Sequence, residues 1–161
     1  MTKVQTARLS LYAVDAAEAR RIHERAPDGD DAWAPDYPFD GDLSALGGFL
    51  RASEQHGEQR PFGYYRLTRQ SDSLAIGGIG FIGPPAAGVV EVGYGLVPSA
   101  RGHGYAAEAL TALLMIARDN GVTRVRADTD PDNIASQKTL TRVGFEPVAR
   151  DSDLHHFEIG L

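Results

Sequence analysis

The sequence of 161 residues contains no cysteine. This absence excludes a disulfide framework, thiolate metal ligands and a cysteine nucleophile. A chain without disulfides suits a reducing compartment, and we expect the protein in the cytoplasm. The first twelve residues lack an apolar core of signal-peptide length. The longest run without a charge, 73–90, holds five glycines and two adjacent prolines, a poor composition for a membrane span.

Basic residues are also few, because 16 Lys and Arg stand against 22 Asp and Glu, for a net charge of −6. Nucleic-acid binding needs a basic face, so the charge balance argues against a nucleic-acid partner. Six acidic residues cluster early in the chain: Asp28, Asp30, Asp31, Asp36, Asp40 and Asp42. Such a run is usually a solvated loop, and the alternative is a rim that attracts a cationic partner.

The spacing of apolar residues predicts an α+β fold, which we expect to be a single domain over residues 1–161. The expected strands cover 7–14, 62–69, 73–83, 88–97, 123–129, 145–149 and 155–161, and the expected helices cover 15–25, 42–56, 106–120 and 133–143. The pattern indicates a mixed, mostly antiparallel sheet of about seven strands with helices on both faces. One helical crossover makes the fourth and fifth strands parallel. The C-terminal strands lie at an edge and permit a homodimer.

Two glycines, Gly102 and Gly104, stand just ahead of the third expected helix. A turn between a strand and a helix directs unpaired N–H groups at one point, and the helix dipole adds to their effect. Such a turn favours a phosphate, and Arg101 adds a charged donor. The alternative is a glycine turn that only tightens the connection.

Three other phosphate or metal sites fit the sequence poorly. The glycines match a dinucleotide fingerprint, but only 57 residues follow Gly104, too few for the remaining parallel units. No Gly-Lys-Ser/Thr is present for a P-loop. The aspartates from Asp128 resemble a calcium loop, but its glycine and its glutamate are missing. The adjacent His155 and His156 face opposite sides of a strand and cannot form a simple two-histidine site, so we expect no metal.

Two stretches, "EVGYGLVPSARGHGYAAEAL" and "NIASQKTLTRVGF", together with the strand order, resemble the GCN5-related N-acetyltransferases (GNAT). The likeness is greatest to the ribosomal-protein N-acetyltransferase (RimJ/RimL-like) branch, although Ala7 replaces the glutamate usual in that branch's first strand. The family signature Q/R-x-x-G-x-G/A is matched by Arg101, Gly104 and Ala106. The later family motif is matched by Asn133, Ser136, Leu140, Gly144 and Phe145. The resemblance implies an acyl-CoA N-acyltransferase fold over nearly the whole chain and is weakest over 28–59.

The resemblance also implies acetyl-CoA as the donor, with its pyrophosphate on the amides of the glycine turn. The pantetheine arm is expected along the strand edge at Leu96 and Val97, where a bulge would part the two parallel strands. The Val97 amide is expected to polarise the thioester carbonyl. Asn133 would bind the pantetheine amides, cap the following helix, or do both. The expected cofactor-binding residues are Leu96, Val97, Arg101, Gly102, His103, Gly104, Tyr105, Ala106 and Asn133.

An amine acceptor of lysine type has a pKa of about 10.4 and must lose a proton before it attacks a thioester. Glu91 is the candidate general base, because it is the sole charge in a strand that we expect to be covered on both faces. The alternative for Glu91 is an ion pair with Arg66 or Arg126.

A proton donor toward the leaving thiolate is the second catalytic requirement. By the resemblance, Ser136 is the candidate acid, and the alternative is a helix hydroxyl bonded to the backbone. Tyr94 and Tyr105 are further candidates, with packing as their alternative.

These residues predict an acetyl-CoA-dependent N-acetyltransferase that acts by direct transfer in a ternary complex. Without cysteine, a cysteinyl acyl-enzyme is excluded. The acceptor is a primary amine, either a protein N-terminus or a small amine, and five aromatic residues are candidates to line its cleft: Trp33, Tyr37, Phe39, Tyr64 and Tyr65. The alternative is a CoA-binding sensor or interaction module without catalysis, and a nucleotide-binding protein is a third possibility.

Overall fold

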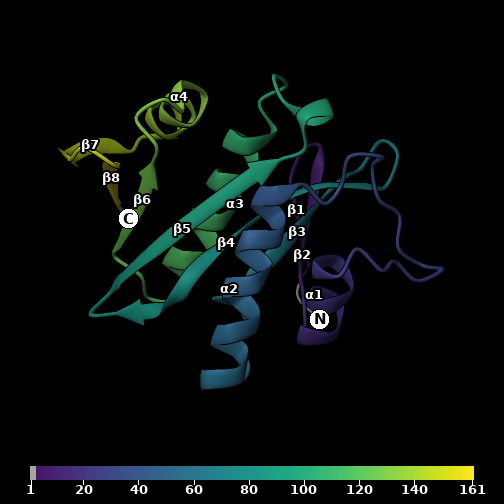
Figure 1. Cartoon of the computed structure of the whole chain (residues 1–161). Coiled ribbons are helices and arrows are strands. Elements are labelled where there is room, and N and C mark those ends of the chain that lie inside the picture. The colour runs from purple at the N-terminus through teal and green to yellow at the C-terminus, as the bar shows by residue number, and fades with distance from the viewer. Residues whose placement is uncertain (1–2) are drawn as a thin grey trace.

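The computed structural model describes residues 3–161, which form one sheet with helices on both sides (Figure 1). The strands are β1 (Lys3–Gln5), β2 (Leu9–Ala13), β3 (Tyr64–Arg69), β4 (Leu74–Ala86), β5 (Val89–Leu96), β6 (Arg124–Thr129), β7 (Glu146–Arg150) and β8 (His155–Gly160). The helices are α1 (Ala16–His23), α2 (Asp40–His56), α3 (Tyr105–Asp119) and α4 (Ile134–Val143), with a 3-10 turn, η1 (Pro98–Ala100), ahead of α3.

The sheet has the order β1-β2-β3-β4-β5-β6-β8-β7, and only β5 and β6 are parallel. This arrangement confirms the mostly antiparallel α+β fold and its parallel crossover through α3. The sheet has eight strands rather than about seven, because β1 pairs with β2. A turn in which the Thr6 N–H donates to the Leu9 carbonyl (2.9 Å) separates the two strands. A strand of three residues is too short to show the alternation of apolar and polar residues that predicts a strand.

Side-chain hydrogen bonds set the beginnings of α1 and α2. Asp15 accepts the Glu18 N–H at 2.8 Å and begins α1 as predicted. Helix α2 begins at Asp40, two residues before the predicted start at Asp42. The reason is that Asp42 lies inside the first turn and reaches back to accept the Phe39 N–H at 3.1 Å. The sequence pattern cannot distinguish a carboxylate at the cap from one three residues later.

The two faces of the sheet are covered differently. Helix α3 packs on β2, β4 and β5 and touches α4, while α1 and α2 pack together, with α2 over β3, β4 and β5 (Figure 1). The predicted apolar face of α3 is buried: Ala109, Leu110, Leu113, Leu114 and Ala117. Along β5, Val90, Val92 and Leu96 are buried, and the alternate residues face the opposite side of the sheet. None of the helices within residues 3–161 has the length and apolar composition to cross a membrane.

Candidate active site

The parallel strands β5 and β6 separate after Glu91. Their register has three pairs, from Val89–Arg124 to Glu91–Arg126, whereas β5 stays paired with β4 as far as Leu96. The expected gap between the parallel strands is therefore present. The expected bulge near Leu96 is not, because the β4–β5 register runs without a shift from Leu96 back to Glu91. The gap arises where pairing stops, not from an inserted residue.

The pairing pattern determines which β5 amides face the gap. The Val97 N–H donates to the Ile76 carbonyl of the neighbouring chain segment at 2.9 Å, so its predicted role as thioester donor is wrong. The direction of N–H groups alternates along a paired strand. Since Val97 faces β4, the N–H groups of Leu96 and Tyr94 face the gap. The Leu96 carbonyl on that side accepts Arg101 Nε at 3.0 Å.

A cavity of about 200 Å³ occupies the gap between β5, β6 and α4. Tyr94 extends from β5 across this cavity to α4, where its Oη lies 2.9 Å from Ser136 Oγ and donates to the Ser136 carbonyl oxygen at 3.2 Å. Burial raises the pKa of Tyr94, and the hydrogen bond to Ser136 opposes that shift. The two hydroxyls form a pair at the gap. Asn133 also lines the cavity and caps α4, accepting the Ser136 N–H at 3.1 Å.

The glycine turn leads into α3 with left-handed backbone, since φ is +83° at Gly102 and +79° at Gly104. The first helical bond of α3 runs from the Glu108 N–H to the Gly104 carbonyl at 3.2 Å. The three preceding N–H groups, from Tyr105 to 107, therefore lack helical partners, and Gly104 has no side chain to accept them. This geometry supports the predicted anion site.

Two arginines that sequence reasoning missed stand beside this turn. A Cβ built on Gly104 would lie 3.5 Å from Arg8 Nη2 and 3.9 Å from Arg142 Nη1. Arg8 also donates to the His103 carbonyl and to Glu108, both at 2.8 Å, and covers the Tyr105 ring at 4.5 Å. Arg8 therefore holds the turn in shape. Each arginine lies within a stretch that resembles the family, but no sequence spacing places either of them beside Gly104.

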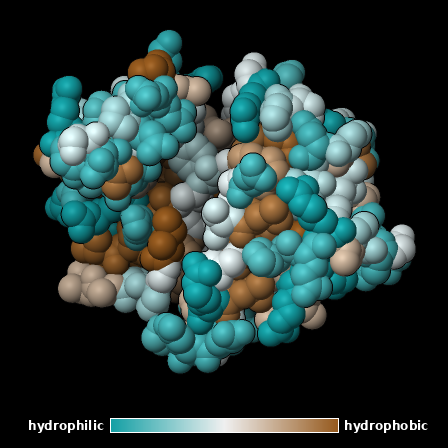
Figure 2. Space-filling model, viewed as in Figure 1, coloured by the Kyte–Doolittle hydropathy of each residue, from teal (hydrophilic) through white to brown (hydrophobic). Residues whose placement is uncertain are grey.

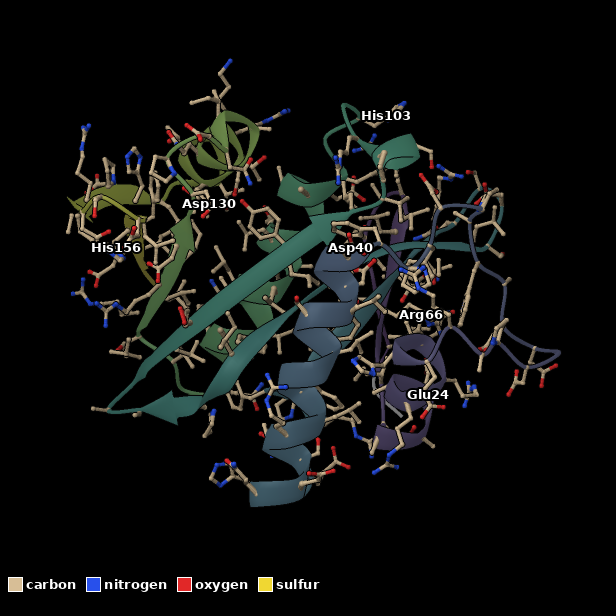
Figure 3. The ribbon with its side chains drawn as sticks, in the orientation of Figure 1. Glu24, Asp40, Arg66, His103, Asp130 and His156 are labelled. Atoms are coloured by element: carbon tan, nitrogen blue, oxygen red, sulfur yellow. The ribbon has the colours of Figure 1, made fainter. Side chains whose placement is uncertain are left out.

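The predicted charged donor of the turn, Arg101, points elsewhere. Its guanidinium is bound to the Leu96 carbonyl and lies 5.4 Å from the centre of the Phe39 ring. The charge of Arg101 is thus held between the end of β5 and the start of α2. The His103 ring stacks on Tyr105 at 5.6 Å, and Figure 3 shows His103 on the loop before α3.

Glu91 is half-buried on the face of β5 opposite α3. Neither predicted ion-pair partner is bound to it, because Arg66 pairs with Glu18 at 2.6 Å and Arg126 pairs with Glu158 at 3.2 Å. Burial raises the pKa of Glu91, and the nearby negative charge of Asp128 adds to the rise. Helices α3 and α2 pack on opposite faces of β5, as expected, but Glu91 lies near the end of the covered stretch and stays partly exposed.

A second cavity, of about 420 Å³, lies between α2 and strands β4 and β5. Figure 2 shows that this face of the molecule is hollowed, with hydrophobic residues along the hollow. Gly93 and Tyr94 line both cavities, so the two cavities lie on either side of the same stretch of β5. Of the five predicted aromatic residues, Phe39 and Tyr64 line the second cavity. The other three pack elsewhere: Trp33 against Tyr37, and Tyr65 with its hydroxyl on the Pro61 carbonyl.

The acidic cluster does not form one rim. Asp31 is bound to Arg21, and Asp36 accepts the Ser99 N–H and hydroxyl at 2.9 and 2.8 Å. Asp42 is buried, with 2% of its surface exposed. Asp28 also pairs with Arg21 at 3.4 Å and Asp40 with Arg25 at 3.7 Å. Five of the six residues are therefore engaged within the protein, which removes the reason to expect a strongly cationic partner there.

Asp42 gives a prediction about stability. Its carboxylate accepts the Phe39 N–H and the Tyr64 hydroxyl, at 3.1 and 3.2 Å, but burial raises the pKa to about 6 from an ordinary 3.8. Between these pH values the folded state holds a proton that the unfolded chain releases, so ionisation of Asp42 destabilises the fold as pH rises. Relative to wild type, Asp42→Asn should gain about 2 kcal/mol of unfolding free energy from pH 4 to pH 7.

Urea unfolding of both proteins at several pH values measures this difference, in which the other titrating groups cancel. A difference that stays flat from pH 4 to pH 7 would show that Asp42 is ionised without penalty.

Together the splayed parallel strands, the uncapped α3 start and the crossover define an acyl-CoA N-acyltransferase fold. A family model described as an acetyltransferase (GNAT) domain matches residues 8–146. The chain belongs to this family of acetyl-CoA-dependent acyltransferases.

Similar proteins match this chain over almost its full length. The uncharacterized N-acetyltransferase YjdG of Bacillus subtilis is 26% identical over 164 residues, which cover 98% of this chain and 97% of that protein. The solved structure of RimL, a ribosomal L7/L12 alpha-N-protein acetyltransferase in complex with coenzyme A, has a TM-score of 0.70 at 19% identity and 99% and 98% coverage. The ribosomal-protein-S5-alanine acetyltransferase of Vibrio fischeri has a TM-score of 0.70 at 16% identity, with 99% and 97% coverage. The predicted family is confirmed, and the neighbours include the predicted ribosomal-protein branch.

Proposed function

We propose that this protein transfers an acetyl group from acetyl-CoA to a primary amine by direct attack in a ternary complex. The observation that carries the proposal is the gap between β5 and β6. It opens toward unpaired amides of β5, contains the Tyr94–Ser136 hydroxyl pair, and shares the lining residue Gly93 with the apolar cavity. Glu91 lies on the acceptor side of the same strand, at the point where the gap begins.

The residues of the turn suit a diphosphate. The guanidinium groups of Arg8 and Arg142 lie within 4 Å of the position that a side chain at residue 104 would occupy, and the N–H groups of 105–107 beside it have no helical partners. Along β5, the Leu96 amide facing the gap would pair with an amide of the pantetheine arm, as strands pair in a sheet. Asn133 uses its side-chain oxygen as a helix cap, which leaves its amide N–H₂ to donate.

The chemistry can be assigned to groups of this chain. Acetyl-CoA supplies a thioester carbonyl that an uncharged amine can attack. Glu91 takes a proton from the ammonium, which frees the nitrogen lone pair. The Tyr94 N–H, which faces the gap, donates to the carbonyl oxygen as negative charge develops there, a role first predicted for Val97.

The Tyr94–Ser136 pair then provides a proton to the departing sulfur. The new bond is C–N and the broken bond is C–S. The amine loses two protons in all and the thiolate gains one, so one proton leaves to solvent. Because the two hydroxyl oxygens are 2.9 Å apart, either group can pass a proton to the other after the transfer.

Removal of the Tyr94 hydroxyl tests the assigned acid. Tyr94→Phe keeps the ring in the cavity and should lower kcat by about 10- to 100-fold, with the KM for acetyl-CoA within about threefold of wild type. Ser136→Ala should lower kcat by less, since Tyr94 remains. Steady-state release of free CoA, followed across pH, measures both.

Tyr12→Phe is the matched control, because Tyr12 lies under Lys3 and Arg66, away from the gap. Unchanged kcat in both Tyr94→Phe and Ser136→Ala would remove these hydroxyls from the mechanism.

The proposed activity itself is tested by CoA release over a panel of amines and N-terminal peptides. Transfer to any primary amine supports the proposal. Tight CoA binding without transfer to any member would instead favour the sensor module.

A further inference from the structure

We infer that the acceptor is a primary amine that carries an apolar group of about phenyl size close to its nitrogen. The apolar group would occupy the cavity between α2 and strands β4 and β5, and the nitrogen would lie beside β5. The inference rests on the proposed function and narrows its acceptor. Two sources share this chemistry: a free arylalkylamine and a peptide with an apolar N-terminal residue.

The size of the cavity fits such a group. Its volume is about 420 Å³, whereas a dry apolar cavity of about 150 Å³ is enough to bind benzene. Small-molecule sites usually measure about 300–1,000 Å³ and are mainly apolar. The space therefore exceeds what a methyl or hydroxymethyl side chain would fill.

The lining of the cavity is apolar and almost without charge. Phe39, Phe49, Phe62 and Ile82 form its walls, together with small residues of α2 and glycines of β4 and β5. Among the described residues, Asp42 is the one charged side chain in the lining, and it presents little surface to the cavity, since it is 2% exposed and each of its oxygens accepts a hydrogen bond from within the protein. A second ammonium or a carboxylate would be desolvated there without a partner, which disfavours polyamines and dipolar tails.

The position of the cavity places the amine at the reacting centre. Gly93 and Gly95 lie on the same face of β5 as Glu91 and line the cavity, while Gly93 also lines the gap. Beyond Glu91, the wall formed by β6 and β8 is charged, with His156 held between Asp128 and Asp151 at 2.6 and 3.0 Å. An apolar group is therefore favoured only on the side toward α2. The ammonium would lie at Glu91, between this apolar cavity and the charged residues of β6 and β8.

A matched amine panel tests this inference. We expect kcat/KM for 2-phenylethylamine to exceed that for ethylamine by about 30-fold, which is the gain from burying one phenyl group. The peptides Phe-Gly-Gly and Gly-Gly-Gly form the second pair and identify the source. A 30-fold preference within either pair supports the inference and assigns the acceptor to that source.

The opposite results separate the inference from the proposed function. If ethylamine, spermidine or Gly-Gly-Gly were acetylated at least as well as the phenyl-bearing compounds, the apolar acceptor would be wrong and acetyl transfer would stand. If no amine were acetylated, both would be wrong.

Filling the cavity gives an independent test. Gly48 lines the cavity, and a Cβ built there has Arg51 Nη2 as its nearest neighbour, at 3.9 Å. The adjacent Gly47 does not line it and instead faces Arg51 and His23, at 3.5 and 3.6 Å. Leucine at either position improves the helix propensity of α2, so we expect both variants to fold.

Gly48→Leu should lower kcat/KM for the phenyl-bearing acceptor of each pair. This loss should be at least tenfold greater than the loss of kcat/KM for ethylamine or Gly-Gly-Gly, the small acceptor of the same pair. Gly47→Leu should keep the wild-type ratio. Equal losses for large and small acceptors in Gly48→Leu, with acetyl-CoA affinity unchanged, would overturn the assignment of the cavity.

Discussion

Glu91→Gln is expected to lower kcat at pH 7 by about 100-fold or more while leaving the Kd for CoA unchanged. Glutamine keeps the shape of this half-buried side chain but cannot accept a proton, and a positioned general base contributes about 10²–10⁴-fold. The wild-type carboxylate must be ionised to act, and its pKa is raised by burial and by Asp128. Activity should therefore fall as the pH drops through that raised pKa.

The acid limb of the kcat profile should disappear in Glu91→Gln. Stopped-assay rates from pH 5 to pH 9 and calorimetric CoA binding provide the two readouts. Glu54→Gln, an exposed change on α2, is the control and should keep the wild-type profile. A Glu91→Gln protein with wild-type kcat would exclude Glu91 as the base, and one that lost CoA affinity as well would assign it a binding role.

The second large effect is expected at the glycine turn, where Gly104→Ala should weaken CoA binding by about 30-fold. Left-handed backbone costs a non-glycine residue about 1–2 kcal/mol, and φ at Gly104 is +79°. The added methyl group would also stand 3.5 Å from Arg8 Nη2 and 3.9 Å from Arg142 Nη1. The change therefore acts on the fold and on the anion site together.

Gly121→Ala separates these two contributions. Gly121 follows the other end of α3, has φ of +87°, and a Cβ there has no neighbour within 4 Å. Gly121→Ala should lose about as much thermal stability as Gly104→Ala but keep the wild-type Kd for CoA. If both variants bound CoA equally well, the turn would not be the diphosphate site.

Local patterns in the sequence were sufficient for most of the fold. The offsets of Ala109, Leu110 and Leu113 marked the buried face of α3. The motif residues Leu140 and Phe145 are core residues, 0% and 2% exposed. These features depend on residues that lie close together in the sequence, so they can be predicted from a single sequence.

The site depended on register and on distant contacts, which the sequence does not display. Leu96 rather than Val97 faces the gap because a shift of one residue reverses the direction of every amide in a paired strand. Arg8 reaches the turn from 95 residues away in sequence, and Tyr94 reaches Ser136 from 42 residues away. The ion-pair alternative for Glu91 failed for the same reason, since each arginine has another acidic partner nearer to it.

The three paired residues that join β5 to β6 have a mechanical consequence. Seven pairs join β4 to β5 and six join β6 to β8, so the C-terminal quarter of the chain is attached to the central strands by a short seam. Bending at that seam would move β6, β8 and α4 together, with Glu91 beside the hinge. The gap between β5 and β6 would then widen or narrow, whereas the cavity under α2, which has no lining residue from these elements, would keep its size.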